Sequence, residues 1–200
     1  MANSNRPMGL SPVKSIVGDA FSGQTNVYQI AAALTTAFAP GDPVVSSGSG
    51  DANGVPGIAL AAASGPIRGV IVGLGTYENG VFNPAGLDSI VRPAAAQAKD
   101  WYALVCDDPN TIFEVQENAN GTALAATDIG MNTVLKVGTN NGFLSGWQLA
   151  SATDATPAVT ATLQVRLLGL SRKVDNAFGA NAKWLVKINA HELSAGTVGL

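Results

Sequence analysis

The residues that could carry out acid–base or nucleophilic chemistry are few in this chain. One histidine, His191, and one cysteine, Cys106, stand among 200 residues, of which 12% are charged. A Ser-His-Asp triad would have to use His191, and Ser49 lies in the best glycine-flanked run but lacks the spacing and following helix of a nucleophile elbow. Enzymes usually gather several titratable groups whose pKa values can be tuned. The inventory therefore predicts a protein that is not an enzyme.

The chain also has few residues that could hold a metal or a cofactor. Zinc sites need three or four Cys or His ligands, and the chain has two such residues. The densest acidic patch is Asp100 with Asp107-Asp108, and the last two fit a turn, where Asp bonds nearby backbone N–H groups. Asp51 begins a run like a calcium loop, but the later glutamate ligand is missing. We expect no metal and no cofactor.

Charge and hydropathy limit the partners. The net charge is −3, and the 11 basic residues are scattered, with only Arg172-Lys173 adjacent, which argues against nucleic acid. No run of about 18 apolar residues is present, so we expect no membrane span. The first residues carry no signal-peptide pattern, which predicts a protein that is made in a cytoplasm and is not exported by itself. Cys106 ends the apolar run 102–106 and is expected as a buried small hydrophobe.

The elements that must position any site are short strands. Helical periodicity is nowhere sustained, and turn signals separate nine or ten strand-like runs, which predicts an all-β sandwich or barrel. Asp107-Asp108-Pro109-Asn110 is expected to join two runs as a hairpin, and Asn79-Gly80 to form another. In the last run, one face is apolar and the other polar, with Leu185 an apolar exception. The clearest runs are 67–74, 101–106, 111–117, 159–170 and 183–191.

The chain is expected to form one domain with an arm. Residues 1–24 mix Pro and Gly with apolar side chains in no regular period, which is typical of an extended arm lying on another surface, or of a frayed terminus. Residues 25–200 are expected as a single β-sandwich domain with a short C-terminal tail. Trp101, Tyr102, Trp147 and Trp184 lie in strand-like runs and are predicted to pack in the core.

Several runs resemble the small head proteins of tailed bacteriophages. They are MANSNRPMGLSPVK, RGVIVGLGTYENG, VRPAAAQAKDWYALVCDDPNTIFEVQE, ATDIGMN and SRKVDNAFGANAKWLVKINAHEL. The chain is similar in these runs to cement, or decoration, proteins, which bind the outside of the major capsid shell. The resemblance implies a jelly-roll-like antiparallel β-sandwich with long loops, association as a dimer, and a virion location after synthesis in the bacterial host. It carries over no individual functional residue.

The expected contacts with the major capsid protein lie at the two ends of the chain. The arm and the tail 191–200 combine apolar side chains with few charges, which suits close approach and edge-strand pairing. The alternatives are a tail or baseplate β module and a carbohydrate-binding jelly-roll module, which would need exposed aromatic residues on one face. The candidate contact residues are Arg6, Met8, Leu10, Val13, Phe21, His191 and Leu193.

Overall fold

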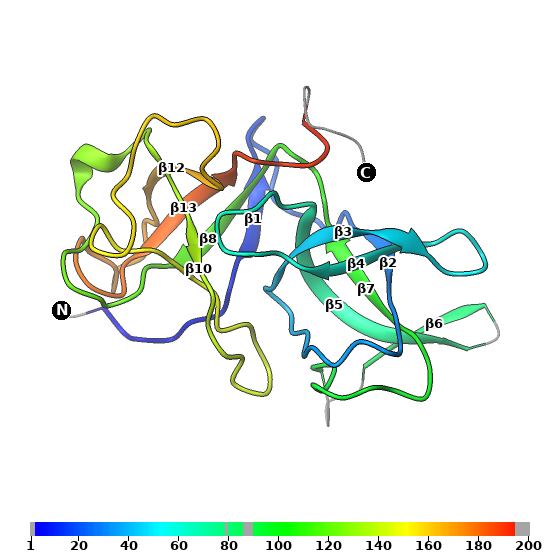
Figure 1. Cartoon of the computed structure of the whole chain (residues 1–200). Helices are drawn as coiled ribbons and strands as arrows, with labels where there is room; N and C mark the ends of the chain where they lie inside the picture. The colour runs from blue at the N-terminus through cyan, green and yellow to red at the C-terminus, as the bar shows by residue number, and fades with distance from the viewer. Residues whose placement is uncertain (1–2, 79, 86–89, 195–200) are drawn as a thin grey trace.

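The computed structural model describes residues 3–78, 80–85 and 90–194, and the chain is all-β with several antiparallel sheets, as expected (Figure 1). The strands form two lobes that lie side by side. The elements are β1 (Ser11–Ser15), β2 (Asn26–Ile30), β3 (Pro43–Gly50), β4 (Pro56–Leu60), β5 (Gly69–Glu78), β6 (Val81–Pro84), β7 (Trp101–Cys106), β8 (Thr111–Gln116), the 3-10 helix η1 (Ala126–Asp128), β9 (Asn132–Thr133), β10 (Leu135–Lys136), β11 (Gln148–Leu149), β12 (Val165–Leu170) and β13 (Lys183–Ile188).

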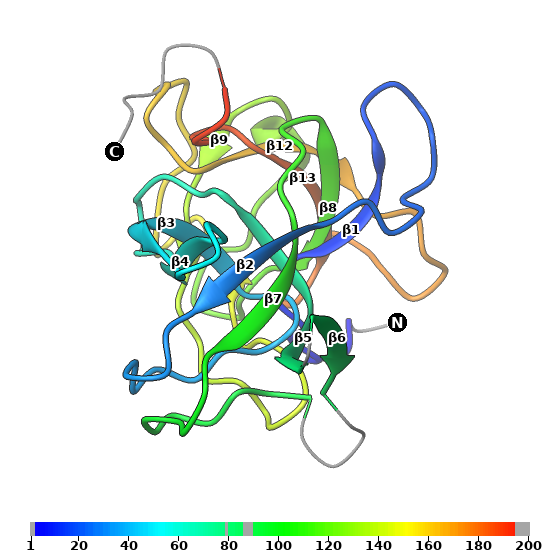
Figure 2. The same cartoon turned by 90° about the vertical axis from the view of Figure 1, so that its right-hand side faces the viewer.

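One lobe is a closed ring of strands (Figure 2). Strands β3, β4, β2, β7 and β5 pair in that order, and β3 also pairs with β5 through Pro43 and Val44. The pairing of β2 with β4 is parallel, and the other pairings in the ring are antiparallel. Strand β6 extends β5 as a hairpin. The interior is filled by Tyr28, Ile30, Phe38, Val44, Ile58, Ile71, Leu74, Ala103 and Val105. Closure leaves the ring strands without a long free edge.

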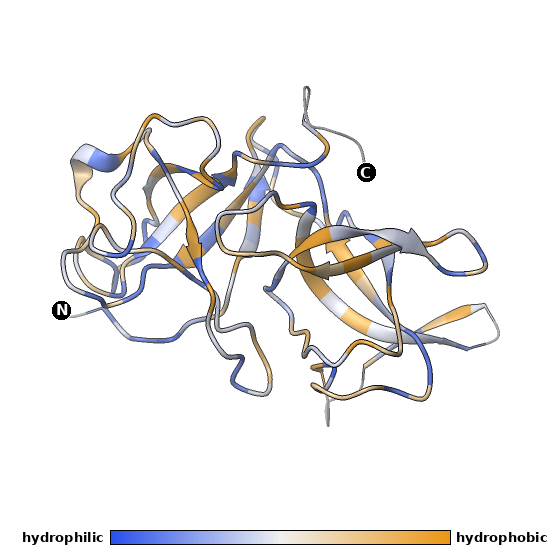
Figure 3. Cartoon of the chain, in the orientation of Figure 1, coloured by the Kyte–Doolittle hydropathy of each residue, from blue (hydrophilic) through white to orange (hydrophobic). Residues whose placement is uncertain are grey.

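The second lobe is built on a five-stranded antiparallel sheet. Its strand order is β1-β8-β13-β12-β9, and β10 pairs with β11 nearby. Hydrophobic residues recur along the strands of both lobes (Figure 3). Side chains of β13 alternate as the sequence predicts: Trp184, Val186 and Ile188 are buried, and the residues between them are half-buried.

A single core joins this sheet to the ring. Phe113, Val115, Trp184 and Val186 from the sheet pack in one cluster with Val70 from β5, together with other buried residues of both lobes. Trp147 and Trp184 are 2% and 0% exposed, so the prediction that they pack in the core is confirmed. Cys106 is likewise buried at 1% exposure, and burial raises the pKa of its thiol.

The expected hairpin at 107–110 is wrong. β7 pairs with β2 and β5 in the ring, whereas β8 pairs with β1 and β13 in the other sheet, so residues 107–110 carry the chain between lobes. The crossing is held by Asp107, which is 6% exposed and accepts hydrogen bonds from Tyr28 Oη at 2.5 Å and Asn26 Nδ2 at 2.8 Å. Burial and Asp107 raise the pKa of Tyr28 to about 12.

The extended arm is also corrected by the structure. Residues 11–15 form β1, which pairs with β8, and the chain then folds back so that Phe21 N donates to Val13 O at 3.0 Å. Gly9 lies against Gly41, where an added Cβ would meet Gly41 O at 2.2 Å, so the approach requires glycine. The segment is therefore part of the folded domain, because β1 joins the five-stranded sheet and Leu10 belongs to the shared core.

Three finer expectations have different outcomes. The Asn79-Gly80 hairpin is confirmed, since Glu78 pairs with Val81, although residue 79 lies outside the described residues. A jelly roll has eight strands in two Greek keys, and the closed ring beside a five-stranded sheet is a different strand order. The strand expected at 159–170 begins only at Val165, because residues 161–164 form turns and bends.

Glu117 gives the shared core a pH dependence. Burial raises the pKa of this carboxyl, 0% exposed, from 4.5 to about 7. The folded chain then holds the proton more tightly than the unfolded chain, so the free energy of unfolding decreases as the pH rises from 4.5 to about 7. Glu117→Gln should show a smaller decrease than wild type, measured by chemical denaturation at both ends of this interval. Asp42, with a pKa raised to about 6, is present in both proteins. Its contribution to the pH dependence is therefore the same in wild type and variant and drops out of the comparison. Equal pH dependence in wild type and Glu117→Gln would contradict the assignment of this effect to Glu117.

Candidate interaction surface

A large groove lies on the outer face of the five-stranded sheet. Its volume is about 1060 Å³. It lies on the face opposite the shared core, because Leu185 lines it while Trp184 and Val186 point inward. Its lining residues come from β1, β8, β12 and β13, from Ile129 after η1, and from the loop that follows β12: Val13, Lys14, Glu114, Ile129, Leu168, Gly169, Leu170, Ser171, Arg172, Lys173, Asn176, Phe178 and Leu185.

Local irregularities shape the floor of the groove. The register of β12 with β13 shifts between Leu167 and Gly169, which is a β-bulge, and Gly169 has φ +156°. The bulge places Leu168 and Gly169 together opposite Leu185. Leu168 lies on the outer face because it alternates with the inward-facing Leu167. Phe178 comes from the 171–181 loop and meets Trp184 edge-on, with ring centroids 5.6 Å apart. Its ring stays 48% exposed, which adds apolar surface to the groove.

The rim of the groove is basic. Its lining includes three cations, Lys14, Arg172 and Lys173, and one carboxylate, Glu114. That carboxylate is already occupied, since Lys173 Nζ lies 2.6 Å from Glu114 Oε1 and Ser171 Oγ donates to Oε2 at 2.5 Å. The groove thus combines an apolar floor with unneutralised positive charge, on a chain whose net charge is −3.

A like-charge pair extends this positive surface. Arg166 lies directly opposite Lys187 across β12 and β13, on the face that carries Leu185. Like charges opposite each other cost a sheet a few tenths of a kcal/mol to about 1 kcal/mol. Arg166 Nε donates to the neutral Asn132 Oδ1 at 3.1 Å, so that contact leaves the positive charge uncompensated.

Of the seven candidate contact residues, Val13 alone lines this groove. Leu10 and His191 are corrected, because each is 1% exposed and neither offers a surface to a partner. Leu10 packs in the shared core. His191 Nδ1 accepts from Leu193 N at 3.0 Å, and burial lowers the pKa of the imidazole to about 4, which keeps it neutral at pH 7.

The other four candidates are dispersed over the molecule. Arg6 is exposed and its backbone N donates to Gln116 Oε1 at 2.7 Å. Met8 is half-buried and lines a small hollow beside Leu144. Phe21 is half-buried against the shared core, and Leu193 is 47% exposed. The rest of the expected tail, residues 195–200, lies outside the described residues.

Sequence reasoning missed most of the groove. Ile129, Leu168, Phe178 and Leu185 come from four segments that only the folded sheet brings together. One signal was present in the sequence: Leu185 breaks the polar face of an otherwise alternating strand. A single exposed apolar residue is ordinary and only a contiguous apolar patch marks a contact surface, so Leu185 alone could not locate the groove.

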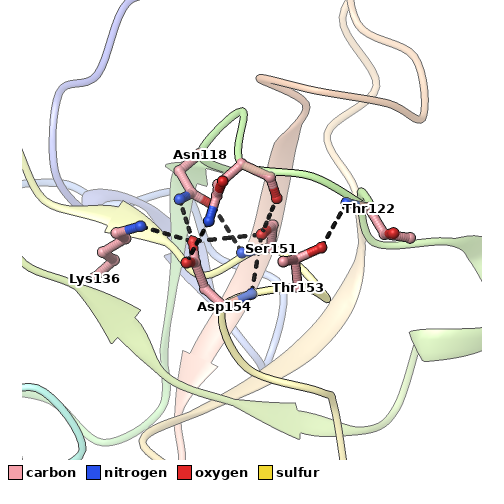
Figure 4. Close-up of polar contacts among 7 residues, drawn as sticks. Asn118, Thr122, Lys136, Ser151, Thr153 and Asp154 are labelled. Atoms are coloured by element: carbon pink, nitrogen blue, oxygen red, sulfur yellow. Dashed lines mark hydrogen bonds and ion pairs between the residues drawn. The ribbon is translucent and has the colours of Figure 1, made fainter.

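A dense polar cluster elsewhere is a clamp within the chain (Figure 4). Asp154 accepts hydrogen bonds from Asn118 Nδ2, from Asn120 Nδ2 at 2.7 Å and from Lys136 Nζ at 2.8 Å. These contacts lower the pKa of Asp154 to about 2. Ser151 Oγ adds a bond to Asn120 O at 2.6 Å. The carboxylate is engaged by its own chain, so it fastens the loop after β8 to the loop after β11.

A smaller aromatic hollow lies on the ring lobe. Tyr77 meets Tyr102 and Phe82 edge-on, with centroids 4.8 and 5.5 Å apart. Tyr77 is 37% exposed, and the hollow beside it, about 560 Å³, is also lined by Asp51 and Asn53. Tyr102 Oη donates to Asp51 Oδ2 at 2.8 Å. Burial, together with this hydrogen bond, raises the pKa of Tyr102 to about 12.

These features describe an all-β scaffold with a broad groove that has an apolar floor and a basic rim. Among the described residues, no three His, Cys, Asp or Glu side chains gather as metal ligands would. In the same part of the chain, no helix is both long enough and apolar enough to cross a membrane. No protein family, curated protein or solved structure matches the chain.

The Asp154 clamp is tested by Asp154→Ala, with Asp175→Ala, an exposed loop carboxylate, as control. Asp154→Ala should lower the midpoint of thermal unfolding at pH 7 more than the control does, because two loops lose their common anchor. The lowered pKa means that the contribution is present above pH 3.8 and is lost as the pH falls towards 2. The unfolding midpoints of the two variants should therefore approach each other as the pH falls. A difference between the midpoints that stays constant down to pH 2 would refute the clamp.

Proposed function

We propose that this chain is a structural virion protein that binds the outer surface of a tailed-phage head and cements neighbouring major capsid protein subunits. The observation that carries the proposal is the groove over β12 and β13, whose apolar floor and basic rim suit a protein partner. The resemblance of the quoted runs to cement proteins supports the same partner. The proposal includes a dimer on the capsid, as that resemblance implies.

The energetics of cementing fit such a surface. A protein that binds only the assembled shell adds its binding free energy to the stability of the lattice. Many copies on one lattice also gain from effective concentration, so each contact can be modest. The titratable groups with strongly raised or lowered pKa values include Glu117, Asp42 and His191, which are buried inside the chain. Their positions favour a binding role over a catalytic one for the groove.

Co-sedimentation with phage heads stripped of accessory proteins tests the proposal. Wild type should saturate at a fixed, lattice-related ratio to the major capsid protein and raise the temperature at which heads rupture. Val13→Asp places a carboxylate in the apolar lining and should reduce binding at least about tenfold. Val159→Asp is the matched control, because Val159 is 89% exposed and does not line the groove.

Two outcomes would overturn the proposal. Binding of only a few copies per particle would move the protein to the tail or baseplate. Failure of wild type to bind at all, with circular dichroism showing a folded chain, would remove the capsid as partner.

The carbohydrate-binding alternative rests on the hollow beside Tyr77. Exposed aromatic rings with nearby polar groups are suited to sugars, whose C–H faces pack on rings while their hydroxyls hydrogen-bond. Under this alternative, maltohexaose or chitohexaose should bind wild type in a calorimetric titration. Tyr77→Ala should lose binding, and Phe143→Ala, which removes a 60% exposed ring on another loop, should keep it. Absence of heat with both sugars would count against the alternative.

A further inference from the structure

The edge of β12 is open beside the groove. Strand β9 pairs with β12 only at Val165 and Arg166. The residues just before β9 extend this contact by one position, since Leu167 N donates to Met131 O at 2.9 Å and Gly130 N donates to Leu167 O at 2.8 Å. Beyond that point the chain departs towards η1. Among the described residues, the strand partner of positions 169–170 is β13 alone.

The open edge and the groove belong to one surface. Leu168, Gly169 and Leu170 form the last part of β12 and also line the groove, with Ile129 on the side where β9 would have continued. Open strand edges pair readily with another extended chain. When an extended segment adds to such an edge, the backbone supplies hydrogen bonds and alternate side chains enter adjoining pockets.

The charges around the open edge favour an incoming strand that carries carboxylates. Lys14, Arg172 and Lys173 line the groove, and Arg166 opposes Lys187 on the same face. Glu114 is already held by Lys173 and Ser171. An incoming segment with carboxylates would neutralise this surface, whereas a basic segment would be repelled. Apolar residues in the segment would cover Leu185 and Phe178.

We propose that the groove takes an extended acidic and apolar segment of the major capsid protein, added as a strand along Leu168–Leu170 of β12. The source of the segment rests on the proposed function, whereas its chemistry rests on the groove itself. The glycine at the bulge has a role in this arrangement, because the space beside its backbone is open, with nothing within 4 Å of an added Cβ.

A peptide assay tests the chemistry without any phage head. The probe is a capped, fluorescein-labelled peptide of about eight residues, within the ordinary range of strand lengths. Threonine occupies every second position, and aspartate and valine alternate at the others, so that both types can face the groove. Fluorescence anisotropy should show that it binds wild type at least about tenfold more tightly than a lysine–valine peptide. A third peptide, with proline at two central positions, should bind about tenfold more weakly than the first, because proline cannot donate to a strand ladder.

Charge reversal at the rim provides the matched variants. Arg172→Glu should weaken the aspartate–valine peptide about tenfold and reduce the preference over the lysine–valine peptide. Lys99→Glu is the control, since it changes the net charge equally but lies in an exposed pair with Glu78 on the ring lobe, 3.2 Å from that carboxylate. Equal binding of the three peptides, no binding of any, or equal effects of the two variants would overturn the proposal.

A cross-linking experiment separates this proposal from the proposed function. Benzoylphenylalanine placed at Ile129, 44% exposed in the groove, should photo-cross-link to an acidic segment of the major capsid protein in saturated heads. The same probe at Phe143 should not. Heads that bind the protein fully but cross-link at position 129 to a basic segment, or to a second copy of this chain, would refute the groove proposal and leave the cement function standing. Heads that do not bind the protein would refute the function, while the peptide assay still decides the chemistry of the groove.

Discussion

Trp184 fills the space between the five-stranded sheet and the closed ring, and its indole Nε1 donates to Glu117 Oε2 at 2.9 Å. Truncating a buried tryptophan to alanine typically lowers the free energy of unfolding by about 3–5 kcal/mol. The packing of Trp184 is therefore a large share of the stability of an ordinary domain. Because side chains alternate along β13, placing Trp184 and Val186 inward commits Leu185 and Lys187 to the outer face. The outward position of Leu185, which lines the groove, is thus a consequence of how the core is filled.

Closure of the ring limits which strands β8 can pair with. β7 has β2 on one side and β5 on the other, so both of its edges are occupied before β8 begins. β8 must therefore pair elsewhere, and Asp107 secures the crossing. The end of the chain adds a second tie between the lobes, since Ser46 Oγ donates to Glu192 Oε2 at 2.6 Å and Ile67 N to Ala190 O at 2.9 Å. A surface carried on such a scaffold is pre-organised, which lowers the entropy cost of binding.

Local patterns predicted local structure well and long-range pairing poorly. The runs at 101–106 and 111–117 match β7 and β8 closely because alternation and flanking turns are local properties. Their pairing as a hairpin was wrong, since nothing in Asp107-Asp108-Pro109-Asn110 reveals that β5 occupies the edge of β7. Leu10 was expected at a partner surface because the segment around it has no period, whereas a core can accept a single apolar side chain from irregular backbone. Leu185 was noticed as an exception, yet its neighbours in the groove come from distant segments.

The core and the groove favour different side chains on the two faces of the same strands. Burying a carboxylate raises its pKa, as at Glu117 and Asp42, so charge is costly on the inner faces. On the outer face of β12 and β13 the cost is smaller, and the sheet tolerates Arg166 opposite Lys187. A stability optimum would place opposite charges at that pair. Under the groove proposal, an acidic segment would relieve this repulsion, so the pair that weakens the free sheet would strengthen the complex.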